Sequence, residues 1–149
     1  MRIGRVSFVV EQEFFNNKPN STLDQMYHNW YNSRMNDEVR LRVFFYKAEY
    51  GSEPVREWLK SLPQEDRKMI GEDIKTVQFG WPLGMPVVRK LDPGLWELRS
   101  NPRNRIARTI FTVEGNVMIL LHGFVKKSQK TPKSDLELAK RRANNLRGK

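Results

Sequence analysis

The chain has 149 residues, which is enough for one domain with a single hydrophobic core. It has no cysteine and only two histidines, which excludes disulfides and thiolate metal sites and argues against a dedicated transition-metal site; no metal and no cofactor are expected. The net charge is +10, and residues 89–149 carry the whole surplus, with 15 basic against 5 acidic residues. This asymmetry predicts a polyanionic partner, most plausibly a nucleic acid, although a merely soluble basic surface is the alternative.

No apolar run approaches the length needed to cross a membrane. The apolar stretch between Arg2 and Val10 is too short for a signal peptide and is followed at once by Glu11 and Glu13. We therefore expect a cytoplasmic protein.

Residues 1–34 form a predicted N-terminal extension to a domain that spans residues 35–149. Within the extension, residues 3–10 could form one strand, whereas residues 16–22 have the composition of a turn or linker. The segment could add an edge strand or cover the sheet, or it could be an upstream start choice that leaves a poorly ordered arm. We favour the second interpretation.

Residues 39–47 alternate in a way that predicts a strand half covered by core, with Leu41, Val43 and Phe45 on one face. Two helices should follow, the first after Ser52-Glu53-Pro54 and the second from Pro63 to Gly80. Their apolar stripes are Val55, Trp58, Leu59 and Leu62, then Met69, Ile70, Ile74 and Val77. The pattern predicts an αα-hairpin on one face of a sheet, with Trp58 in the core rather than in a binding site.

A rigid loop over residues 81–86, whose apolar side chains should pack over the sheet edge, leads to residues 87–91. Three apolar runs then predict an antiparallel meander: residues 95–99, 106–113 and 117–125. The last run is apolar on both faces, so it should be central. A final helix should begin after Thr131-Pro132, with a stripe of Leu136, Ala139, Ala143 and Leu146.

Two motifs in this order resemble a known family. The run LLHGFVKKSQKTPK (residues 120–133) and the run YKAEYGSEPVREWLKSL (residues 46–62) closely resemble the signature of the HigB-like, phage-derived branch of the RelE/ParE toxin superfamily. The resemblance extends from about Val39 onward. It implies an α+β, RelE-like fold, namely an antiparallel β-sheet with an N-terminal αα-hairpin on one face and a C-terminal helix.

The resemblance also implies a function. Similar proteins are toxins of type II toxin–antitoxin systems that act as ribosome-dependent mRNA endonucleases, or mRNA interferases, and inhibit translation. The implied partners are a helix-turn-helix (HigA-like) antitoxin, the ribosome and mRNA. Two alternatives stay open: a ParE-like toxin that binds gyrase, and a non-toxic RNA-binding relative.

Cleavage of RNA by its own 2′-hydroxyl requires a base, positive charge on the phosphate oxygens and an acid for the departing 5′-oxygen. Lys and Arg can supply all three. The positions that match the family are Arg99, Arg108, Lys126 and Lys127. The candidate catalytic residues are Arg99, Arg108, Glu97 and Lys127, and the candidate RNA-binding residues are Lys126, Lys130, Lys133 and Arg105. Arg108 is predicted to clamp the phosphate, or else to be a solvated edge charge; Arg99 could instead pair with Glu97 or with another carboxylate.

The sequence departs from the RelE pattern in two places. Leu95 and Glu97 stand where that branch has lysines. Glu97 could act as the general base or could shift the pKa values of neighbouring cations, so the identity of the general base stays open. Residues 128–149 contain no aromatic residue to match the C-terminal tyrosine of RelE. We interpret His122 as a buried histidine bonded to backbone rather than as a catalytic group.

Overall fold

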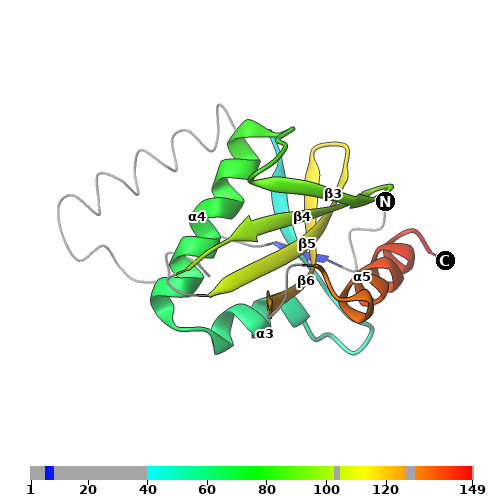
Figure 1. Cartoon of the computed structure of the whole chain (residues 1–149). Coiled ribbons are helices and arrows are strands. Elements are labelled where there is room, and N and C mark those ends of the chain that lie inside the picture. Colours follow the sequence, from blue (N-terminus) through cyan, green and yellow to red (C-terminus); the bar gives the residue numbers. More distant parts are fainter. Residues whose placement is uncertain (1–5, 9–39, 103–104, 127–129, 149) are drawn as a thin grey trace.

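The structure is a computed structural model that describes residues 6–8, 40–102, 105–126 and 130–148. It confirms the predicted α+β class (Figure 1). In chain order the elements are β1 (Val6–Phe8), β2 (Arg42–Tyr46), α3 (Pro54–Ser61), α4 (Gln64–Gly80), β3 (Val88–Asp92), β4 (Leu95–Ser100), β5 (Ile106–Glu114), β6 (Val117–Lys126) and α5 (Lys133–Leu146). No helix in this described part of the chain is long and apolar enough to cross a membrane.

The strands form one sheet in the order β1-β2-β6-β5-β4-β3. β6 lies between β2 and β5, in the interior position that its apolar pattern predicted. The sheet is mixed rather than wholly antiparallel, because β2 runs parallel to β6 while the other described pairs are antiparallel. A long connection through α3, α4 and three strands separates β2 from β6, so no tight turn forces these two strands to be antiparallel.

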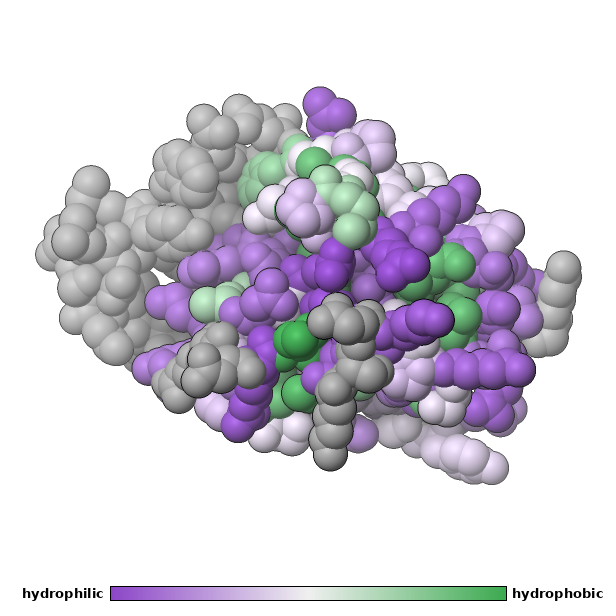
Figure 2. Space-filling model, in the orientation of Figure 1, coloured by the Kyte–Doolittle hydropathy of each residue, from purple (hydrophilic) through white to green (hydrophobic). Residues whose placement is uncertain are grey.

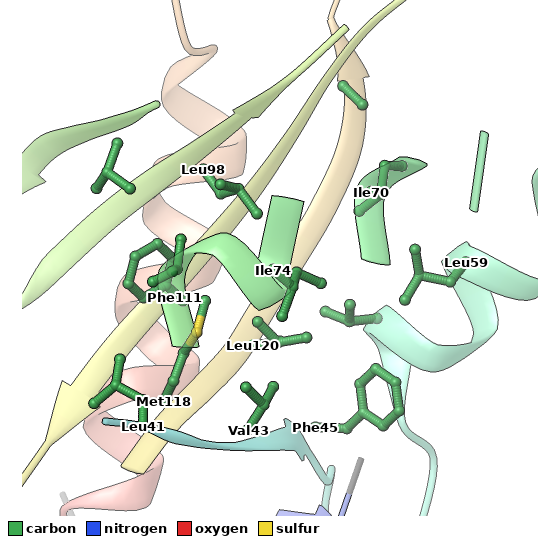
Figure 3. Close-up of a cluster of buried hydrophobic side chains, with 14 residues drawn as sticks. Leu41, Val43, Phe45, Leu59, Ile70, Ile74, Leu98, Phe111, Met118 and Leu120 are labelled. Atoms are coloured by element: carbon green, nitrogen blue, oxygen red, sulfur yellow. The ribbon is translucent and has the colours of Figure 1, made fainter. Parts of the chain in front are cut away.

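The helices α3 and α4 cover one face of the sheet, which confirms the predicted αα-hairpin (Figure 1). Figure 3 shows the core beneath them, where side chains from both helices meet those of four strands: Leu41, Val43, Phe45, Leu59, Ile70, Ile74, Leu98, Phe111, Met118 and Leu120. Trp58 packs against this core, as predicted. Met69 was predicted to be buried, but it is 40% exposed because it lies at the edge of the α4 stripe.

The opposite face carries a second core under α5. The buried helix residues Ala139, Ala143 and Leu146 pack there with Leu95 of β4 and Ile110 of β5. Small alanine side chains allow a close approach between helix and sheet. The core stops at Leu95 and Ile110, so the polar residues that follow on β4 and precede on β5 lie beyond it.

Residues 88–92, for which no helix or strand was predicted, form an edge strand paired with β4. The cause is a hairpin turn at Asp92-Pro93-Gly94, in which Gly94 has φ +77°. Glycine adopts this conformation without the steric cost that a Cβ atom would impose. The pairing places Arg89 directly opposite Glu97.

At the other edge, β1 pairs antiparallel with β2. Three residues of the predicted extension therefore form a strand, within the range 3–10, where the sequence indicated a possible strand. The remainder of residues 1–34 lies outside the described residues.

Gly123 provides a first test of the fold. A Cβ atom at this position would lie 2.0 Å from Cε3 of Trp58, so the α3 helix would have to move away from β6. We expect Gly123→Ala to lower the free energy of unfolding by about 1–3 kcal/mol, as overpacking does in other cores. Chemical unfolding followed by tryptophan fluorescence measures this change.

The control is Gly84→Ala, because nothing lies within 4 Å of the added Cβ atom. It should leave stability unchanged. The loss of unfolding free energy in the double variant Trp58→Leu, Gly123→Ala should be smaller than the sum of the losses in the two single variants, because the smaller leucine side chain relieves the clash. Strict additivity would contradict direct contact between these two positions.

Candidate functional site

Four basic side chains gather on the sheet face that carries α5. In the strand register, Arg89 lies opposite Glu97, and Arg99 lies opposite Arg108. Lys126 lies opposite Ile106, which is two residues from Arg108. Opposite residues, and residues two apart on a strand, share a face. We call the four cations Arg89, Arg99, Arg108 and Lys126, which surround Glu97, the basic face.

Glu97 and Arg108 form a buried ion pair at the centre of the basic face. Glu97 is 1% exposed and Arg108 is 3% exposed. The Arg108 Nε lies 3.4 Å from Oε1 of Glu97, and an Nη of Arg108 donates to the Ala107 carbonyl at 2.9 Å. The Thr131 hydroxyl donates a hydrogen bond to the other Glu97 oxygen. The carboxylate therefore joins β4, β5 and the segment before α5.

This arrangement decides two alternatives left open by the sequence. Arg108 is not a solvated edge charge, and it is Arg108, rather than Arg99, that pairs with Glu97. Arg99 is half exposed, and its guanidinium contacts the Met85 sulfur at 3.7 Å. Its backbone N–H donates to the Val87 carbonyl at 2.9 Å. Arg99 is thus fixed at its backbone and presents its charge at the surface.

Burial, and after it the crowding of like charges, changes the acid–base chemistry of the site. Burial lowers the pKa of Lys126; Glu97 opposes this shift, and the arginines of the basic face add to it. Burial also lowers the pKa of Arg108, again against the effect of Glu97. Lys126 therefore releases its proton more readily than an ordinary lysine does. A bound anion would relieve the repulsion among the cations.

The other predicted residues lie around this site or away from it. Lys130 and Lys133 are exposed and flank Thr131. Arg105 is 51% exposed and pairs with Asp66 of α4 at 3.5 Å, so it contacts the helix on the opposite face of the sheet. The structure does not group Arg105 with the basic face. Lys127 lies outside the described residues.

Sequence reasoning missed two members of the site. Arg89 was not identified because β3 was not predicted as a strand. The turn-forming sequence Asp92-Pro93-Gly94 could have indicated the hairpin, and with it the alternation of side chains along β3. Thr131 was assigned only to the start of the last helix, whereas its hydroxyl donates a hydrogen bond to Glu97, which is distant in sequence. No local pattern identifies such a contact.

His122 was predicted to bond to backbone, but its ring bonds to side chains of α5. Its Nε2 lies 2.6 Å from Oδ1 of Asp135, and an Nη of Arg142 lies 3.4 Å from its Nδ1. Because a guanidinium can only donate, the tautomer that fits both contacts accepts at Nδ1 and donates from Nε2 to Asp135. Arg142 also donates to the Leu121 carbonyl at 2.7 Å, which fixes α5 on β6.

Within the described ranges, no three or more His, Asp or Glu side chains come together in a way that could hold a metal ion. Hydrophilic side chains predominate on the face shown in Figure 2, where they lie over the strands and around α5. The groups that this site offers to a ligand are therefore cations, with one buried carboxylate beneath them.

The fold is that of a RelE-like domain. The family described as "Phage derived protein Gp49-like (DUF891)" matches residues 57–144, which is more than half of the chain. The protein belongs to this family, a family of RelE-like toxins associated with toxin–antitoxin systems, and membership implies an antitoxin partner. The matched range includes all four residues of the basic face. A search of curated proteins found no match.

Proposed function

We propose that this protein is a HigB-like toxin of a type II toxin–antitoxin pair, and that it is an endoribonuclease which cleaves mRNA on the ribosome. One observation carries the proposal: in a family of RelE-like toxins, four cations from four strands converge over a single buried carboxylate. An anionic ligand on this face would meet positive charge from several directions at once. RNA backbone fits that requirement.

The proposed reaction is a transesterification within the RNA. The 2′-oxygen attacks the adjacent phosphorus, the bond to the 5′-oxygen breaks, and the products are a 2′,3′-cyclic phosphate and a 5′-hydroxyl. Arg99 and Arg89 are the accessible cations that would bind the non-bridging oxygens as their charge develops. Lys126, which is buried and whose pKa burial lowers, is one candidate to move a proton, and Lys127 is a second candidate from the sequence.

Glu97 takes a different role in this proposal from the one that the sequence suggested. A general base must reach the proton that it removes. Glu97 is 1% exposed, and its oxygens already face Arg108 and the Thr131 hydroxyl. We therefore assign Glu97 to positioning: it fixes Arg108 beneath the site and ties the segment before α5 to the sheet.

The ribosome would supply what the basic face lacks. Phosphate contacts position RNA but do not by themselves align the 2′-oxygen, the phosphorus and the leaving oxygen. A ribosome that holds the codon in place could do so. The cognate antitoxin, proposed to carry a helix-turn-helix domain, would neutralise the toxin in the cytoplasm, and an acidic segment of it would complement the basic face.

The proposed function predicts that cleavage depends on translation. In a translation extract, the protein should cut a translated mRNA at discrete positions inside the reading frame, mapped by primer extension. The same mRNA without its start codon is the control, and it should be cut much more slowly in the same extract. Equal cutting of both RNAs would contradict dependence on the ribosome. Intact messages with gyrase-linked DNA damage in cells would favour the ParE-like alternative.

A further inference from the structure

An aromatic side chain continues the line of cations across the sheet. Arg99 of β4 lies opposite Arg108 of β5, and Arg108 lies opposite Phe124 of β6. The three side chains therefore form one row on the same face. Phe124 lies one strand beyond Arg108 and two strands beyond Arg99. Because neighbouring strands are about 4.8 Å apart, the backbone of Phe124 is about two such spacings from that of Arg99.

The Phe124 ring is held from one side and half exposed. It stacks on the His122 ring, with centroids 5.5 Å apart and an interplanar angle of 22°. His122 is in turn fixed by Asp135 and Arg142 of α5. The orientation of the Phe124 ring is therefore set by a chain of contacts that ends on the helix.

Single-stranded RNA is bound by two kinds of group. Cations contact its phosphates, and aromatic rings stack on its bases. On the described parts of β4, β5 and β6, the row holds both kinds of group, since Arg99 supplies accessible charge and Phe124 supplies a ring, with the buried Arg108 between them. A base can reach Phe124 while a phosphate of the same strand lies at Arg99.

We infer that Phe124 is the platform on which a nucleobase of bound single-stranded RNA stacks, next to the phosphate at Arg99. The inference rests on the proposed function, and it names a substrate-binding residue that the sequence did not suggest. His122 and Asp135 are positioning residues in this inference, since they set the ring without contacting the base.

Fluorescence of 2-aminopurine tests the stacking directly, because stacking on a ring quenches it. The probe is a single-stranded RNA oligonucleotide that carries 2-aminopurine and is 2′-O-methylated throughout, so that it cannot be cleaved. Binding to the full-length protein at low salt should quench the probe at one or more positions along the oligonucleotide. Phe124→Leu should abolish that quenching and weaken binding roughly tenfold, whereas Phe124→Tyr should retain both.

Phe44→Leu is the matched control. Phe44 is also a half-buried phenylalanine packed on the second core, but it lies on β2, away from the row. This variant should bind and quench as the wild type does. Its behaviour separates loss of the platform from general loosening of the core beneath α5.

Two results would overturn the inference. If Phe124→Leu quenches the probe like the wild type at every labelled position, the base does not stack on Phe124. If Phe44→Leu loses binding as severely as Phe124→Leu does, the effect is structural. Either result leaves the proposed function standing where translated mRNA is still cut. A wild-type protein that neither binds the probe nor cuts translated mRNA would overturn both.

Discussion

Arg99→Ala is expected to lower the rate of cleavage of translated mRNA by about two to three orders of magnitude, the size of effect seen when one donor to a developing oxyanion is removed. Arg99 is half exposed on the basic face, and the side-chain contact shown for it is to the Met85 sulfur. The free energy of unfolding should therefore change by no more than about 0.5 kcal/mol. Cleavage at matched protein concentration and chemical unfolding measure the two quantities.

Two further variants test whether a loss of cleavage in Arg99→Ala comes from this position or from the loss of one positive charge. Arg42→Ala removes an exposed positive charge from β2, away from the basic face, and should cleave at the wild-type rate. Arg99→Lys keeps the charge but not the planar pair of donors, so its rate should lie between those of the wild type and the alanine variant. If Arg42→Ala is as slow as Arg99→Ala, the site depends only on total charge, and the assignment of Arg99 is wrong.

Much of the fold could be predicted because local patterns determine it. The alternation in β2, the two helical stripes and the antiparallel meander each arise from patterns within a few residues, and each appears in the structure. The direction of β2 could not be predicted in this way. It depends on which neighbour β2 pairs with after a long connection, and its partner β6 lies more than 70 residues further along the chain.

The site was harder to predict because the role of each side chain depends on how deeply it is buried as well as on its residue type. The sequence identified Arg99, Arg108 and Lys126, and strand periodicity correctly placed Glu97 on the face of Arg99. It could not show that Glu97 and Arg108 are buried, since the segment at Thr131 reaches Glu97 only in the folded chain. Burial changes the role assigned to both residues. The sequence suggested that Glu97 was a surface base and Arg108 a surface phosphate clamp, whereas the structure makes them an internal ion pair.

The burial of Arg108 leads to a second large effect. Arg108→Met is expected to lower the free energy of unfolding by about 3–5 kcal/mol, because it leaves the Glu97 carboxylate buried without its partner charge. This expectation differs from the one for a strand-surface arginine, whose loss would cost little. Chemical unfolding at pH 7 measures the change.

The double variant Glu97→Gln, Arg108→Met tests the cause of that loss. It removes both charges, while the glutamine amide oxygen can still accept the hydrogen bond from Thr131. Replacing both members of a buried pair is often close to neutral, so the double variant should recover most of the stability that Arg108→Met loses. If the double variant is as unstable as the two single changes combined, packing of the Arg108 side chain, rather than its charge, stabilises this part of the sheet.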